Sequence, residues 1–319
     1  MKSRSSLLLT WATIILILAA PCLMAQTANS HTPPAAAQQP NFSNVEIKVT
    51  KVADTVYMLE GMGGNIAVSV GDDGIFMVDD QFAPMAPKIK AALKGISDKP
   101  VRFLLNTHYH GDHVGGNAEF GPAALIIAQD NVRKRLEEGT IGWNGNKVPP
   151  TPKEGLPVLT FNDRLTLHLN GEDIRITHIP NAHTDGDSVV FFPQANVVHM
   201  GDLFVTYGFP IVDVNNGGHV SGMIAGIEQF FSALPADVKV IPGHGPLCNV
   251  EDVRKFVAMM KETRALVAQA AQQGKTPEQM KQAHLLAKYE DLGKGMIKAD
   301  QWIDLLYAEV TEKTGSARQ

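Results

Sequence analysis

Three histidines and one aspartate lie within six positions of the sequence, at His108, His110, Asp112 and His113. Imidazole nitrogens with one carboxylate oxygen suit Zn²⁺ best, and similar sets of donors also hold iron or manganese. A loop that turns into a helix after Gly111 would direct the first two histidines one way and Asp112 with His113 the other. The cluster therefore predicts two adjacent metal ions, which together lower the pKa of a shared water and make it a nucleophile.

The segments around this cluster predict an α/β arrangement that places the donors at the end of a strand. Residues 101–106 form an apolar, β-branched run, which predicts a buried strand that stops where the histidines begin. A helix is expected over residues 84–96, where Ile89, Ala92 and Leu93 share one face. Alternating runs separated by glycine-rich turns predict earlier antiparallel strands at residues 45–49, 56–59, 65–70 and 74–78.

The second half of the chain predicts another sheet followed by helices. Residues 139–157, rich in glycine and proline, are expected to form a long irregular loop. Trp143 in this loop either contacts substrate or packs the loop down. Strands are expected at residues 124–128, 163–169, 174–179, 188–192, 197–200 and 238–241, and helices at 131–138, 219–234, 250–273, 277–288 and 299–313.

Three short motifs follow the cluster in order: Asn-Ala-His-Thr at 181–184, Met-Gly-Asp-Leu-Phe at 200–204 and Pro-Gly-His-Gly at 242–245. Together with His-x-His-x-Asp-His and the Gly-Gly after it, they resemble the signature of the metallo-β-lactamase fold superfamily. The resemblance covers about residues 45 to 250. It implies an α/β fold, a four-layer αβ/βα sandwich of the metallo-β-lactamase type, to which a C-terminal helical extension is added here.

The resemblance also implies a ligand set of seven side chains for two zinc ions, with iron or manganese as alternatives. Asp112 is in addition the expected catalytic residue, because it can orient the nucleophile or carry a proton. Asp79, which ends a predicted strand, is expected to orient a metal-binding histidine, and Asp80 is the alternative. The first metal would be held by His108, His110 and His183, the second by Asp112, His113 and His244, and Asp202 would bridge both.

The function implied is that of an exported dinuclear zinc hydrolase, in which a hydroxide shared by the metals opens a cyclic amide, as in the β-lactamases of antibiotic resistance. Asp202 departs from many of these β-lactamases and resembles glyoxalase II and lactonases. Val205 stands where cysteine-containing lactamases have a lysine for the drug's carboxylate; Tyr207, Asn215 or Asn216 either replace it by hydrogen bonding or shape the loop. A lactonase, esterase or thioester hydrolase is therefore the alternative, and a non-catalytic metal-binding protein is a third interpretation.

Composition is that of a globular protein of 319 residues, 44% hydrophobic and 19% charged. The net charge is −5, and without residues 1–25 it is −7, from 26 basic against 33 acidic residues. The sequence therefore lacks the basic footprint of a nucleic-acid binder, and a small-molecule substrate is expected.

The N-terminus predicts export. Lys2 and Arg4, an apolar run from Leu7 to Ala20 and small residues near Ala25 are typical of a signal peptide over residues 1–25. Periplasmic or secreted location without stable membrane association after cleavage is expected, with an uncleaved anchor or lipidation at Cys22 as alternatives. A flexible linker (26–44), the metallo-β-lactamase-like domain (45–273) and the C-terminal helical extension (274–319) would follow.

Overall fold

The structure is a computed structural model that describes residues 41–316, with side chains described as far as residue 312. The expected signal peptide and residues 26–40 of the expected linker lie outside the described residues. None of the helices within the described range is both long and apolar enough to cross a membrane.

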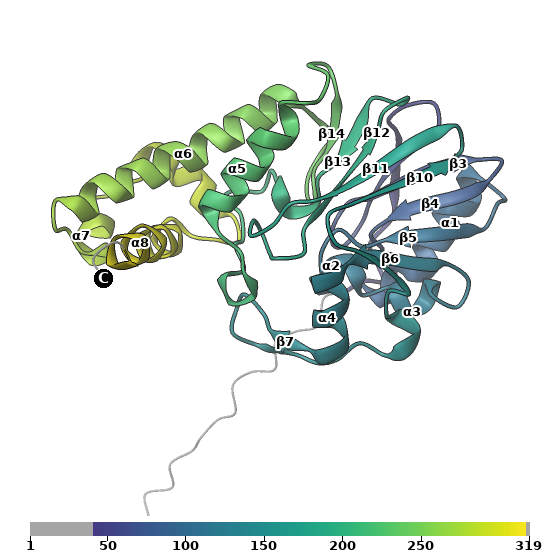
Figure 1. The fold of residues 1–319 in the computed structure, drawn as a ribbon, viewed down its shortest axis with the longest axis horizontal. Helices are drawn as coiled ribbons and strands as arrows, with labels where there is room; N and C mark the ends of the chain where they lie inside the picture. Colours follow the sequence, from purple (N-terminus) through teal and green to yellow (C-terminus); the bar gives the residue numbers. More distant parts are fainter. Residues whose placement is uncertain (1–40, 317–319) are drawn as a thin grey trace, which may run out of the picture. The chain divides into compact units, whose positions relative to one another are not determined.

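Two β-sheets form the centre of the fold (Figure 1). In spatial order, the first four strands of the first sheet are antiparallel neighbours, whereas its fourth to seventh strands are parallel. The first sheet, in spatial order, contains β1 (Lys48–Lys51), β2 (Val56–Glu60), β3 (Ile66–Gly71), β4 (Gly74–Val78), β5 (Val101–Leu105), β6 (Leu125–Gln129) and β9 (Leu159–Phe161). The second contains β10 (Arg164–Leu169), β11 (Glu172–His178), β12 (Ser188–Phe192), β13 (Val197–His199), β14 (Lys239–Ile241) and β15 (Cys248–Asn249).

The inner faces of the sheets pack on each other through β-branched and aromatic side chains, as the alternating strand patterns require. Phe76 of β4 meets Phe192 of β12 edge to face, with ring centroids 6.1 Å apart. Helix α1 (Ala86–Ile96) covers the outer face of the first sheet through Ile89 and Leu93. Helices α5 (Val220–Phe231) and α6 (Val250–Gln272) cover the outer face of the second. This order of layers confirms the predicted sandwich.

The remaining helical segments are short, except the last. The C-terminal region contains α7 (Pro277–Gln282) and α8 (Ala299–Ser316), and α8 packs along α6, as predicted for a helical extension (Figure 1). These segments are α2 (Gly111–Val114), α3 (Asn117–Phe120), α4 (Asp130–Glu138), α7 (Pro277–Gln282) and α8 (Ala299–Ser316), with 3₁₀ turns η1 (Ala83–Met85), η2 (Lys153–Gly155), η3 (Gly201–Leu203), η4 (Val214–Asn216) and η5 (Ala287–Lys294).

Three sequence predictions are corrected by the structure. The first strand was expected at 45–49 but lies at Lys48–Lys51, because Val45 and Ile47 pack beside the α1 layer instead of entering the sheet. Helix 277–288 ends at Gln282, because His284 has a left-handed φ of 49°. The loop 139–157 is not wholly irregular, since β7 (Thr140–Ile141) and β8 (Lys147–Val148) form a small hairpin that carries Trp143.

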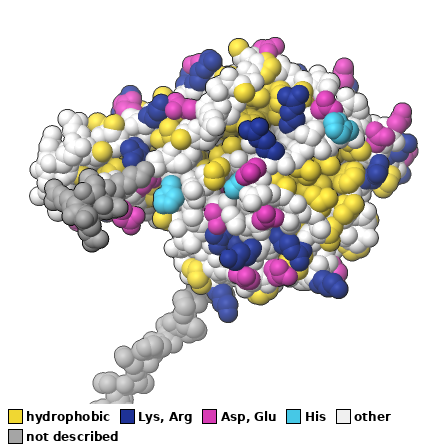
Figure 2. Space-filling model, in the orientation of Figure 1, with side chains coloured by type: hydrophobic (Ala, Val, Ile, Leu, Met, Phe, Trp, Pro, Cys, Tyr) yellow, Lys and Arg dark blue, Asp and Glu magenta, His cyan; other side chains and the backbone are white. Residues whose placement is uncertain are grey.

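Two side chains of α8 fix the C-terminal region onto the part of the fold that covers the second sheet. Trp302 of α8 stacks on Phe209 with ring centroids 5.3 Å apart and donates from Nε1 to Thr263 Oγ1 at 3.0 Å. Glu309, also of α8, accepts a hydrogen bond from the backbone nitrogen of Val220, the first residue of α5, at 2.8 Å. A buried carboxylate thus satisfies one of the free amides at a helix N-terminus. On the face shown in Figure 2, acidic and basic side chains are interspersed among exposed apolar ones.

Candidate metal centre

The histidine motif occupies the turn between the first sheet and its next helix. β5 ends at Leu105 and α2 begins at Gly111, so the predicted loop that turns into a helix is confirmed. Asp79, at the end of β4, holds this loop: its carboxylate accepts from the Thr107 backbone nitrogen at 2.7 Å and from Thr107 Oγ1 at 2.8 Å. His108, one residue further on, is therefore fixed at the carboxyl ends of parallel strands, where α/β folds place their sites.

The second sheet supplies the other donors from three loops. His183 follows β11, Asp202 lies in η3 after β13, and His244 follows β14. Gly201 permits the two sheets' loops to meet, because it has a positive φ of 51° and a Cβ there would lie 2.8 Å from Thr107 Oγ1. A side chain at position 201 would push Asp202 away from the histidine motif.

The seven side chains predicted from the resemblance all meet at one place. Asp202 lies between two groups of donors: its Oδ1 is 3.2 Å from His113 Nε2 and 3.5 Å from His244 Nε2, and its Oδ2 is 3.8 Å from His183 Nε2. Within each group the donor atoms lie no more than 4.8 Å apart. The first group contains His108, His110, His183 and Asp202. The second group contains Asp112, His113 and His244.

Hydrogen bonds on the far side of the histidines direct their lone pairs inward. His183 Nδ1 lies 2.8 Å from the carbonyl oxygen of Ile211, to which only a protonated nitrogen can donate. His113 Nδ1 lies 2.8 Å from Asp79 Oδ2. Each bond leaves Nε2 as the free acceptor that a metal ion requires. The prediction that Asp79 orients a ligand is therefore confirmed; Asp80 instead accepts from the Gly116 backbone nitrogen.

Unpaired buried polar atoms are a second observation which indicates that the donor set fits metal ions. His108 Nε2, His113 Nε2 and Asp202 Oδ1 are buried and have no partner in hydrogen-bond geometry. They are three of the eight buried side-chain atoms without a partner among the described residues, and all three belong to the seven clustered donors, although buried polar atoms in proteins are usually paired. Cations between the two groups would satisfy these atoms, so the residues present fit a metal site.

Electrostatics divide the cluster into two kinds of histidine. Burial lowers the pKa of His183 to about 4, and the neighbouring His110 acts in the same direction. Burial opposes protonation of His244 too, but the carboxylates of Asp202 and Asp112 outweigh it and raise the pKa to about 9. Burial likewise opposes ionisation of Asp112, yet the charges of His113 and His244 hold its pKa at about 2. Positive charge is therefore most stabilised in the part of the cluster next to the carboxylates of Asp112 and Asp202.

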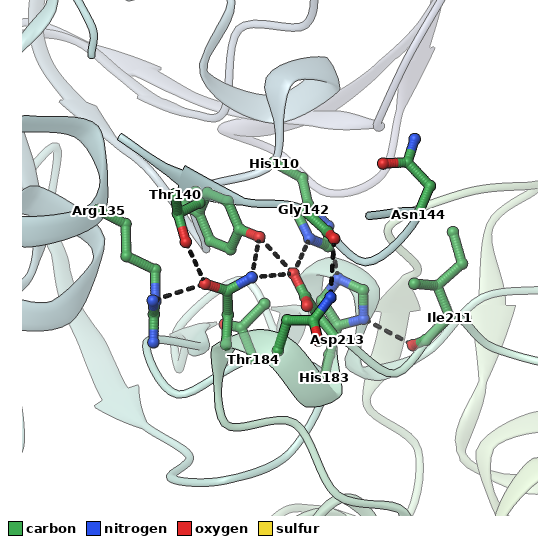
Figure 3. A network of polar contacts seen from close by, with 12 residues as sticks. His110, Arg135, Thr140, Gly142, Asn144, His183, Thr184, Ile211 and Asp213 are labelled. Atoms are coloured by element: carbon green, nitrogen blue, oxygen red, sulfur yellow. Dashed lines mark hydrogen bonds and ion pairs between the residues drawn. The ribbon is translucent and has the colours of Figure 1, made fainter. Parts of the chain in front are cut away.

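Asp213 is a buried site residue that the sequence analysis missed. His110 Nε2 lies 3.1 Å from its Oδ2, and the same oxygen accepts from Tyr109 and, at 2.8 Å, from Asn216 Nδ2 (Figure 3). Burial opposes ionisation of Asp213, but these hydrogen bonds lower its pKa. His110 is thus held with Nδ1 toward His183 Nε2, 2.9 Å away. An aspartate within the apolar run 209–214 was the available signal.

Asn215 and Asn216 shape the loop, which was one of their two predicted roles. Asn216 Nδ2 donates to the carbonyl oxygen of Ile141 at 2.7 Å. Asn215 Nδ2 donates to the carbonyl oxygen of Gly142 at 3.0 Å (Figure 3). Their amides are therefore engaged with the β7–β8 hairpin. Tyr207 does line the cavity above the metal centre, with its ring centroid 5.5 Å from that of His244.

Among the residues that the structure describes, the histidines outside the motifs do not belong to the metal cluster. His168 is exposed and pairs with Asp173. His178 bonds the carbonyl oxygen of Asp185. His199 is buried between the Asn65 carbonyl oxygen and the Gly201 backbone nitrogen, so it holds the turn before Asp202.

Comparisons with known proteins agree with this geometry. Residues 55–253 match the family model of the metallo-beta-lactamase superfamily. Metallo-beta-lactamase type 2 of Bacteroides fragilis is 22% identical over 222 residues, 65% of this chain and 82% of that protein. Hydroxyacylglutathione hydrolase of Pelagibacter ubique is 26% identical over 159 residues, 49% of this chain and 57% of the relative.

Among solved structures, a metallo-beta-lactamase from Pontibacter korlensis superposes with a TM-score of 0.56 at 17% identity, over 68% of this chain and 99% of that one. At this identity the likeness concerns the fold alone. The family match covers more than half of the chain and contains all seven clustered donors. The chain therefore belongs to the metallo-beta-lactamase superfamily and is a metal-dependent hydrolase with a histidine and aspartate metal site.

Proposed function

We propose that this protein holds two zinc ions in the seven-residue cluster and opens a cyclic amide by addition of water. The observation that supports this proposal is the convergence of all seven donors, with Asp202 between the two groups and buried donor atoms left without hydrogen-bond partners. A pair of bound zinc ions supplies a nucleophile at neutral pH and polarises the carbonyl under attack. Iron or manganese would fit the same donors less well.

Asp112 and Asp202 have different parts in this proposal because they differ in exposure. The Asp202 side chain is 4% exposed and lies between the donor groups, so it holds the site together. The Asp112 side chain is 28% exposed and lines the cavity with His244. Asp112 can therefore reach a bound substrate and orient the attacking water or carry a proton to the leaving group.

A neutral ester or lactone is the second candidate substrate. β-Lactam drugs carry a carboxylate, and the described residues that line the cavity include no lysine or arginine. Val205, at the position of the lysine expected in cysteine-containing lactamases, is buried at 2% exposure in the hydrophobic core. An uncharged substrate would need no cation at this place.

A substrate panel tests these alternatives. Zinc-loaded protein is assayed in parallel with a chromogenic cephalosporin, an acyl lactone and a thioester, and the Asp112→Asn variant serves as the control for background hydrolysis. Cleavage of the cephalosporin supports the first candidate and selective cleavage of the lactone supports the second. If the protein binds two metals and cleaves none of the three, the hydrolase proposal is wrong and a metal-dependent binding protein remains.

We also propose that the chain is exported, from the charged and apolar pattern of residues 1–25. Expression in a Gram-negative host, followed by N-terminal sequencing of the periplasmic fraction, tests this. Recovery of a chain that begins near residue 26 is expected. An intact N-terminus in the cytoplasm would contradict export.

A further inference from the structure

The cavity above the metal centre has a volume of about 390 Å³ and walls from segments far apart in the sequence. Its floor is polar and contains Asp112, Asp202 and His244. Its walls are mostly apolar. They come from the turn after β4, the β7–β8 hairpin, the loop after η3 and the segment between η5 and α8, which supply Phe82, Trp143, Val148, Tyr207, Ile211 and Met296.

Trp143 and Met296 are unusual among these walls because they are large apolar side chains exposed to solvent. Trp143 is 36% exposed and Met296 is 56% exposed, although both line the cavity. Leaving such side chains in water forgoes the free energy that burial would give. Their placement at one functional cavity therefore points to burial by a ligand.

Both walls are held in place without a ligand. The hairpin is tied to η4 through Asn215 and Asn216, and Thr140 Oγ1 donates to Asn216 Oδ1 at 2.5 Å (Figure 3). Met296 precedes Ile297, whose backbone pairs with that of Phe209 as an antiparallel bridge. An apolar ligand would thus meet preformed walls and would not have to order them.

Away from the metal-binding floor, the cavity walls offer an anion no cationic partner among the described residues. Arg135 is the cation on the adjoining network, but its Nε donates to Asp185 Oδ1 at 2.8 Å and its Nη1 to Asn216 Oδ1 at 2.6 Å. It is not among the described residues that line the cavity, whereas Asp112 is. An anionic group beside Trp143 would lose its hydration without gaining a partner.

We propose that Trp143 and Met296 form a subsite for an uncharged apolar chain next to the scissile bond, so that the C-terminal region helps to determine specificity. This inference rests on the proposed hydrolase function and favours neutral esters or lactones over anionic substrates. Met296 lies in the C-terminal region, outside residues 55–253 that match the superfamily model.

The test compares two substrates that share a leaving group and differ in charge: p-nitrophenyl heptanoate and the mono-p-nitrophenyl ester of adipic acid. Zinc-loaded full-length protein should favour the heptanoate in kcat/KM. Trp143→Ala and Met296→Ala should each lower kcat/KM for the heptanoate by about tenfold, mainly through KM, because each removes apolar contact with the chain. Met296→Lys should shift the preference toward the adipate ester by about tenfold.

Val158 provides the matched control. It is 68% exposed and lies outside the cavity lining, so Val158→Ala and Val158→Lys should leave both the rates and the preference unchanged. If the Met296 and Trp143 variants keep the wild-type preference within twofold, the subsite proposal is overturned.

A binding measurement separates this inference from the proposed function. N-Phenyl-1-naphthylamine, a neutral fluorescent dye, should bind the zinc-loaded protein, and Trp143→Ala and Met296→Ala should raise its Kd about tenfold. If neither ester is cleaved but dye binding depends on both residues, the subsite stands and the ester candidate of the proposed function falls. If esters are cleaved and dye affinity is equal in all variants, the subsite falls alone.

Discussion

Replacement of Asp213 tests whether a residue that is not itself a metal donor controls the metal site. Asp213 is fully buried, and its Oδ2 is shared by Tyr109, His110 and Asn216. Asp213→Ala removes the acceptor for all three donors at once. The variant tests one physical claim: the hydrogen bond to His110 Nε2 directs Nδ1 toward the metal.

The magnitude follows from the groups left without partners. Each buried donor that loses its acceptor costs about 1–3 kcal/mol, so the free energy of unfolding should fall by about 3 kcal/mol after partial relaxation. Loss of a partner that orients a metal-binding histidine typically lowers metal affinity by about 10- to 100-fold. Asp213→Asn retains the shape and one acceptor oxygen, so its zinc affinity should lie between those of Asp213→Ala and the wild type.

Zinc affinity is measured by competition with a chromogenic chelator, and stability by denaturant unfolding with the metal removed. Asp173→Ala is the matched control, because Asp173 also pairs with a histidine, His168, but on the surface and away from the cluster. It should change neither quantity appreciably. Unchanged zinc affinity in Asp213→Ala would refute the role of Asp213 in positioning His110.

Two further predictions concern the C-terminal helix and the thiol. Glu309→Ala should lower the free energy of unfolding by about 2 kcal/mol, because the backbone amide at the start of α5 and the Arg264 side chain lose a buried acceptor. Denaturant titration measures this change, and an unchanged midpoint would show that the contact is not stabilising. Burial raises the pKa of Cys248 to about 11. In the Cys22→Ser variant, iodoacetamide at pH 7.5 should therefore alkylate Cys248 about 20-fold more slowly than it alkylates free cysteine. The rate should rise as the pH approaches 11. Alkylation at the rate of free cysteine would contradict this environment.

Four of the seven donors were predictable because their signals are local, and His183, Asp202 and His244 were predictable from the motifs that resemble the superfamily. His108, His110, Asp112 and His113 share one turn, and the strand before them is a plain apolar run. Asp79 was predictable from the resemblance to the superfamily, which places an orienting acid at the end of this strand, although Asp80 remained an alternative. The two sheets followed from period-two patterns.

Residues whose roles depend on distant partners were not predictable. Asp213 meets Tyr109 across 104 positions of sequence, so an aspartate in an apolar run marked the position as unusual but did not indicate its partner. Met296 reaches the cavity only because η5 and α8 fold back on Phe209. The early end of helix 277–288 depends on one left-handed residue, His284, which helix propensity does not reveal.

Metal stoichiometry tests the central claim most directly. Elemental analysis of the purified wild-type protein after zinc loading should find two zinc ions per chain, and Asp202→Ala should retain about one, because Asp202 lies between the two donor groups. A wild-type protein that binds no transition metal, or an Asp202→Ala variant that keeps both ions, would contradict the account.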